Sequence, residues 1–131
     1  MKKPTPNVLD HMTSIPYSIT SDQTLARAHA VMREHLIRHL PVFTNGVLVG
    51  ILTDRDLHLI ETLKDVNPDE VTVEDAMSPS PYTVSFDTPL AEVCAEMAEH
   101  KYGCAVVMQH DKVIGIFTTI DACRALADLL A

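Results

Sequence analysis

The chain contains a long internal repeat, which limits the possible folds more than any other feature of the sequence. The segment Gly50-Ile51-Leu52-Thr53-Asp54-Arg55-Asp56 returns 65 residues later as Gly115-Ile116-Phe117-Thr118-Thr119-Ile120-Asp121. The same shift, without a gap, aligns further identical residues, which include Val8 with Val73, Met12 with Met77, Tyr17 with Tyr82, Leu25 with Leu90 and His35 with His100. A repeat of this length indicates two copies of one supersecondary unit.

The length of the chain sets how the two copies are organised. We place the first copy at residues 8–65 and the second at 73–131, with a leader over 1–7 and a linker over 64–72. A copy of fewer than about seventy residues buries its strands poorly by itself. We therefore expect the copies to share one core and to unfold in a single cooperative transition.

Local patterns predict the same element order, β-α-β-β-α, in each copy. Short strands are expected over 16–20 and 81–85, because β-branched and aromatic residues there follow a proline. Apolar residues at helical spacing predict amphipathic helices over 25–36 and from 90 to 100. Thr88-Pro89 predicts a clear helix start in the second copy, whereas Asp22 and Thr24 give a less clear one in the first.

The second half of each copy is expected to hold two strands and a helix. Strands are predicted over 40–43 and 47–52, and over 105–108 and 113–117. Asn45-Gly46 between the first pair is the strongest short hairpin signal, whereas His110-Asp111 indicates another turn type. Final helices follow over about 57–63 and 122–130. The predicted fold class is α/β (α+β), with two tandem repeats packed as one pseudo-two-fold unit.

Composition argues against several classes of partner and compartment. The formal net charge is -8, which disfavours nucleic acid and anionic membranes because both recruit Lys and Arg. The three cysteines, Cys94, Cys104 and Cys123, form no C-x-x-C pair and favour reduced thiols. No signal-peptide core or membrane-length apolar run is found, so we expect a cytoplasmic protein.

The repeated Thr-x-x-Asp motif lies where a predicted strand meets a predicted helix. As pure structure it is a capping box, in which Thr and Asp satisfy each other's backbone amides. Its occurrence at matched positions favours a further role, and so does the glycine three residues before each Thr, which often marks a close backbone approach. A helix N-terminus also attracts anions, and an ionised Asp can accept both hydroxyls of a ribose.

The repeated order, Leu40-Pro41-Val42 before the hairpin and the doubled Gly-x-x-Thr-x-x-Asp resemble a tandem CBS-domain pair over about residues 8–131. The resemblance implies a regulatory module with two clefts between the copies, each binding an adenine nucleotide or related adenosyl ligand. Expected ligands are AMP, ADP or ATP, or S-adenosylmethionine. When the family's motif is matched to this sequence, Thr53 and Asp56 belong to one cleft, and Thr118 and Asp121 belong to the other. The resemblance also implies a homodimer and a regulated partner protein, which remains unknown.

The two expected sites differ in charge. Arg38-His39 and Arg55 accompany Asp56, whereas Gly103-Cys104 and Ile120 occupy the corresponding positions near Asp121. We therefore expect the Asp56 site to prefer phosphorylated ligands. We expect the Asp121 site to be weaker, empty, or selective for a less negative ligand.

Two alternatives to a ligand sensor remain open. An enzyme is not expected, because no nucleophile triad, P-loop, zinc motif or catalytic carboxylate pair is found. A ligand-free dimerisation or interaction module would use Thr-x-x-Asp only for capping. The apolar positions over 122–130 favour a homodimer in either case. The repeated His35 and His100 are expected near helix C-termini, where the dipole favours a cation, rather than in a metal site.

Overall fold

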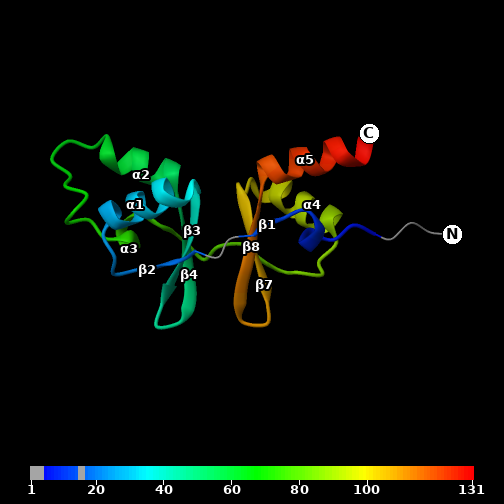
Figure 1. Ribbon diagram of the computed structural model, residues 1–131, viewed down its shortest axis with the longest axis horizontal. Coiled ribbons are helices and arrows are strands. Elements are labelled where there is room, and N and C mark those ends of the chain that lie inside the picture. Colours follow the sequence, from blue (N-terminus) through cyan, green and yellow to red (C-terminus); the bar gives the residue numbers. More distant parts are fainter. Residues whose placement is uncertain (1–4, 15–16) are drawn as a thin grey trace. The chain divides into compact units, whose positions relative to one another are not determined.

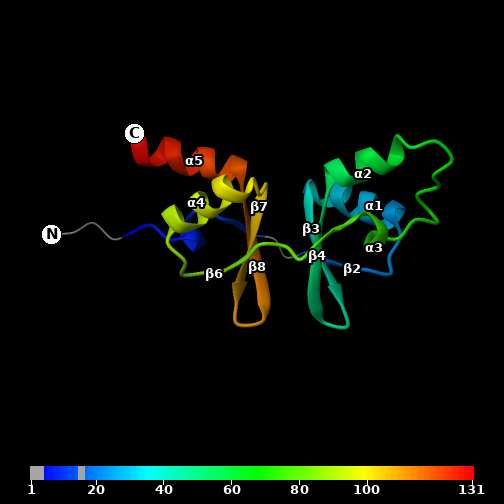
Figure 2. The same cartoon turned by 180° about the vertical axis from the view of Figure 1, so that it is seen from behind.

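The computed structural model describes residues 5–14 and 17–131, and these form two compact units (Figures 1 and 2). We call residues 17–81 the Asp56 unit and residues 5–14 with 82–131 the Asp121 unit. The mixed α+β architecture confirms the expected fold class. Residues 1–4 of the expected leader, and Pro16 of the first expected strand, lie outside the described residues.

The Asp56 unit is built on a sheet with the strand order β2-β3-β4-β5. Its strands are β2 (Ile19–Thr20), β3 (His39–Thr44), β4 (Val47–Thr53) and β5 (Ser78–Pro79). Its helices are α1 (Leu25–His35), α2 (Asp54–Glu61) and α3 (Val73–Ala76). Leu25, Leu40 and Leu52 belong to its aliphatic core.

The Asp121 unit repeats this plan with the strand order β1-β8-β7-β6. Its strands are β1 (Thr13–Ser14), β6 (Thr83–Ser85), β7 (Cys104–Gln109) and β8 (Lys112–Thr118). Its helices are η1 (Val8–Asp10, a 3-10 helix), α4 (Leu90–His100) and α5 (Thr119–Leu130). Phe117 is fully buried in its core.

Each unit contains the leading segment of the other sequence repeat. Val8, from the start of the chain, is fully buried in the core of the Asp121 unit, and Val73 is fully buried in the core of the Asp56 unit. Figure 1 shows the blue start of the chain lying with the yellow-to-red elements of the Asp121 unit. The structural units and the sequence repeats therefore begin at different residues.

The exchanged segments add an edge strand that the expected β-α-β-β-α order lacks. β1 pairs antiparallel with β8, and β5 pairs antiparallel with β4. This pairing explains the repeated glycines. A Cβ on Gly50 would lie 2.8 Å from the Ser78 carbonyl oxygen, and one on Gly115 would lie 2.6 Å from the Thr13 carbonyl oxygen. The glycines thus admit a neighbouring strand, which is the close approach that the sequence indicated.

Local signals around the hairpins and helix ends have mixed outcomes. Asn45 and Gly46 have φ of 50° and 79°, as a type I′ turn requires, whereas at the other hairpin only His110 has a positive φ. Both helices begin where they were predicted, but the prediction that Thr88 gives the clearer cap was wrong. Thr24 caps α1 by accepting a hydrogen bond from the Arg27 amide, but α4 has Pro89 at its N-cap and no side-chain cap.

Candidate functional site

The first candidate site is the junction where β4 ends and α2 begins. His39 is the register partner of Thr53 across the β3–β4 pair, and the Asp54 amide donates to the Arg38 carbonyl oxygen at 3.0 Å. Thr53 and Asp56 form a full capping box. The Thr53 amide donates to Asp56 Oδ2 at 2.9 Å, and the Asp56 amide donates to Thr53 Oγ1 at 3.2 Å. The fold thus gathers the backbones of Arg38, His39 and Thr53 and the Asp56 side chain at one corner of the sheet.

The second candidate site is the equivalent junction between β8 and α5. Cys104 is the register partner of Thr118, and the Thr119 amide donates to the Gly103 carbonyl oxygen at 3.3 Å. The capping box recurs here. The Thr118 amide donates to Asp121 Oδ2 at 2.9 Å, and the Asp121 amide donates to Thr118 Oγ1 at 3.3 Å. The structure therefore brings both expected residue sets together, each within its own unit.

The two carboxylates differ in how accessible they are. Asp56 is half-buried, and among the described residues its only side-chain hydrogen bond is to the Thr53 amide. Asp121 is only 3% exposed and also accepts a hydrogen bond from the Thr13 hydroxyl at 2.8 Å. Asp56 is therefore the carboxylate with capacity for an external donor.

The cations near Asp56 are placed differently from one another. Arg38 has an 80% exposed side chain, and its Nε lies 4.0 Å from Asp54 Oδ2. It lines a pocket of about 270 Å³ between α1 and α2, whose lining does not include Thr53 or Asp56. Arg55 is exposed in the first turn of α2. Part of the positive charge expected for a phosphate is thus already shared with Asp54.

The repeated histidines lie at the ends of α1 and α4, where the dipole was expected to favour them. His35 stacks on Tyr17 with the ring centroids 3.7 Å apart. In the other unit His100 stacks on Tyr102, and Tyr102 stacks on Tyr82, both with centroids 5.1 Å apart. Among residues 5–14 and 17–131, no group of three or more His, Cys, Asp or Glu side chains is placed to hold a metal ion.

Sequence reasoning missed Thr13, whose hydroxyl contacts Asp121. Its repeat counterpart is Ser78, so both copies carry a hydroxyl at this position. That shared hydroxyl was the feature of the sequence that could have identified Thr13 as a site residue. Its meaning depends on the exchange of the leading segments, because Thr13 belongs by sequence to the copy that contains Asp56.

The CBS domain family model matches residues 8–59 and 73–128. L-aspartate semialdehyde sulfurtransferase from Methanocaldococcus jannaschii is 30% identical over 126 residues. The alignment covers 95% of this chain and 24% of that protein, so the chain spans about a quarter of its relative's length.

Two solved structures extend the similarity to the fold. The CBS domain pair of protein MJ0100, in complex with 5'-methylthioadenosine and S-adenosyl-L-methionine, has a TM-score of 0.82 at 26% identity, with 95% of this chain and 98% of that chain covered. CBSX2 in complex with AMP has a TM-score of 0.76 at 25% identity, with 95% and 98% covered. In the described part of this chain, no helix is long and apolar enough to cross a bilayer. From the two family matches and the shared architecture, we conclude that the chain belongs to the CBS domain family.

Proposed function

We propose that the chain is a regulatory module that binds an adenine nucleotide or a related adenosyl ligand at the Asp56 junction, without catalysis. The observation that carries this proposal is the half-buried Asp56 carboxylate, which keeps hydrogen-bonding capacity beside the N-terminus of α2. A ribose diol offers two donors to such a group, and the helix end favours an anion nearby. The adenosyl compounds bound by the MJ0100 pair and by CBSX2 support the ligand class.

The proposal is tested by calorimetry with adenosine, AMP, ATP and S-adenosylmethionine. Asp56→Asn keeps the size of the side chain and an acceptor for the Thr53 amide, but removes the charge. Since hydrogen bonds to a charged group contribute about 1.5–3 kcal/mol, affinity should fall about 10- to 150-fold. Asp121→Asn is the matched control and should leave this binding unchanged. Loss of binding in Asp121→Asn alone would assign the ligand to the other junction.

Phosphate recognition is the finer part of the proposal. We assign it to Arg55, Arg38 and His39, together with the α2 N-terminus, so that AMP, ADP or ATP is preferred over uncharged adenosine. Arg38→Ala and Arg55→Ala should weaken ATP more than adenosine, and more at low salt because screening is weaker. Because Arg38 already lies near Asp54, its effect should be the smaller of the two. Equal losses for ATP and adenosine would contradict a phosphate role.

A ligand-free interaction module is the second candidate function. The two complete capping boxes favour it, because they give Thr53, Asp56, Thr118 and Asp121 a purely structural role. The same calorimetry separates the candidates. Failure of every adenosyl compound to bind at millimolar concentration would favour the interaction module.

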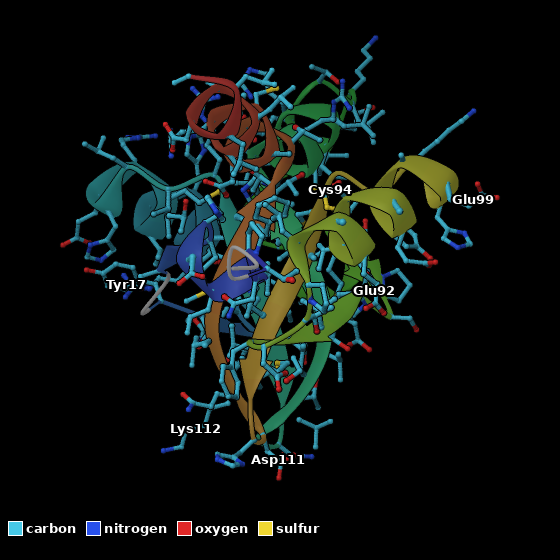
Figure 3. All side chains as sticks on the ribbon, turned by 90° about the vertical axis from the view of Figure 1, so that its right-hand side faces the viewer. Tyr17, Glu92, Cys94, Glu99, Asp111 and Lys112 are labelled. Atoms are coloured by element: carbon cyan, nitrogen blue, oxygen red, sulfur yellow. The ribbon has the colours of Figure 1, made fainter. Side chains whose placement is uncertain are left out.

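We also propose that the module is a homodimer that regulates a separate partner protein. An apolar groove of about 540 Å³ runs between α4 and α5, and its lining contains no charged residue. Figure 3 labels Cys94 on α4, whose thiol lines this groove and has a pKa raised by burial. Leu126 and Leu129, at the same groove, are each 57% exposed. A second copy is the favoured occupant, because a contact through this uncharged apolar groove places no like charges against each other even though each chain has a net charge of -8.

Sedimentation of Leu126→Asp tests this interface. A buried charge at the contact should convert the dimer to a monomer at micromolar concentration. Leu59→Asp is the matched control, because Leu59 is 65% exposed on α2 in the other unit. A monomeric wild-type chain, or a Leu126→Asp variant that stays dimeric, would rule out this interface.

A further inference from the structure

Asp121 is a buried carboxylate whose oxygens are already occupied. Oδ2 accepts hydrogen bonds from the Thr118 amide at 2.9 Å and from the Thr118 hydroxyl at 3.2 Å. Oδ1 accepts from the Thr13 hydroxyl at 2.8 Å and from Arg124 Nη1 at 3.4 Å. With 3% exposure, this carboxylate has its partners inside the unit rather than in solvent.

The two donors on Oδ1 differ in how easily they can leave. Arg124 has a 67% exposed side chain and a long bond to Asp121, so its guanidinium can move into solvent at little cost. Thr13 is held by β1, which pairs with β8 through Thr13 with Ile116 and Ser14 with Gly115. Displacing its hydroxyl from Asp121 therefore requires a rotation against a β-branched χ1 preference or a shift of the strand.

The Asp56 unit offers an internal comparison at the same register. Ser78 pairs with Ile51, just as Thr13 pairs with the equivalent Ile116. Ser78 is exposed, as Thr13 is, but within residues 17–131 it makes no side-chain hydrogen bond to Asp56. The strand is therefore present in both units, whereas the hydroxyl-to-carboxylate contact is made in only one of them.

We propose that Thr13 determines ligand specificity between the two junctions, because its hydroxyl occupies the Asp121 oxygen that a ribose diol needs. This inference rests on the proposed recognition of a ribose by the motif aspartate. A ribose presents two hydroxyls and engages both carboxylate oxygens. At Asp56 no side-chain donor of the described residues competes with the ribose, whereas at Asp121 the ribose must displace the Thr13 hydroxyl. Ligand occupancy is thus set by a residue outside the repeated motif.

The test uses the full chain and adenosine, which carries a ribose and no phosphate. Thr13→Val removes the hydroxyl at nearly constant shape, and Ser78→Ala is the matched control in the other unit. In an Asp56→Asn background, Thr13→Val should tighten adenosine binding about tenfold or more, as loss of a competing donor to a charged group predicts. Adding Asp121→Asn to Thr13→Val should remove this increase in adenosine affinity, and Ser78→Ala should not increase the affinity.

Amide hydrogen exchange along β8 verifies that β1 stays paired in Thr13→Val, and Thr13→Ala serves as a second variant that removes the same hydroxyl. Wild-type binding at Asp56 with no gain from either variant overturns the inference and leaves the proposed function intact. A different result would support the inference and overturn the proposed function. In that case the wild type does not bind adenosine, Thr13→Val does bind it, and adding Asp121→Asn abolishes this binding. No binding in any variant overturns both.

Discussion

The Asp56 and Asp121 junctions share a capping box but place their carboxylates in different surroundings. In both, the Thr amide donates to Asp Oδ2 at 2.9 Å. Asp56 nevertheless stays half-buried, whereas Asp121 is 3% exposed and bonded to Thr13. The motif therefore builds the cap in each unit, and the edge strand is present in both, but only Thr13 forms a hydrogen bond with the carboxylate of its unit.

The largest expected effect on stability separates the two aspartates. Asp56→Ala removes one helix cap and should cost about 1 kcal/mol of unfolding free energy. Asp121→Ala removes a cap and also the part-buried hydrogen bond between the Thr13 hydroxyl and a 3% exposed carboxylate, so its cost should be about 2–4 kcal/mol. Urea unfolding measures both. Equal costs would mean that the Thr13 contact contributes nothing to stability.

The glycines test whether the edge strands cause the difference between the two junctions. Gly50→Ala and Gly115→Ala should each cost about 1–3 kcal/mol, because the new methyl group would overlap a backbone carbonyl of β5 or β1. Gly115→Ala should cost more, because moving β1 also draws Thr13 away from Asp121. Gly103→Ala is the control, since nothing lies within 4 Å of its added Cβ, and it should stay within about 0.5 kcal/mol. A neutral Gly115→Ala would show that β1 does not hold the junction.

The smallest effect concerns the helix starts. Thr24→Ala should cost about 1 kcal/mol, because the Thr24 hydroxyl accepts from the Arg27 amide at 3.2 Å. Thr88→Ala should change stability by less than about 0.5 kcal/mol, since the structure shows no side-chain cap at the start of α4. Thermal unfolding of the two variants compares them directly. A larger loss of stability in Thr88→Ala than in Thr24→Ala would show that Thr88 caps α4, as the sequence predicted.

Much of the fold could be predicted because its signals are local. Apolar spacing located α1, α4 and α5, and Asn45-Gly46 identified its hairpin, since each depends on residues close in the chain. The capping boxes were equally accessible, because Thr and Asp lie three residues apart. β1 and β5 were missed, since each is two residues long and contains no Val, Ile, Leu or aromatic residue, whereas the equally short β2 ends a run of β-branched and aromatic residues.

The non-local part of the candidate site could not be predicted. The repeat showed that Asp56 and Asp121 are equivalent in sequence, and charge counting predicted that their sites differ. The structure adds a second difference, the contact of Thr13 with Asp121, which forms only because the leading segments are exchanged between units. No local pattern specifies the unit against which such a segment packs. Gly50 and Gly115 indicated that another backbone segment lies close to them, but not which segment it is.

The exchange of leading segments also sets an order of assembly during synthesis of the chain. All described residues of the Asp56 unit lie within one continuous stretch, so its core and sheet are complete once residue 81 has left the ribosome. Thr13 and Asp121 are 108 residues apart, so the start of the chain must wait with Val8 uncovered until β8 and α5 have been made. We expect ribosome-bound chains that are stalled after residue 81 has emerged, but before β8 and α5 have been made, to protect the Asp56 unit from proteolysis while residues 5–14 remain open to cleavage.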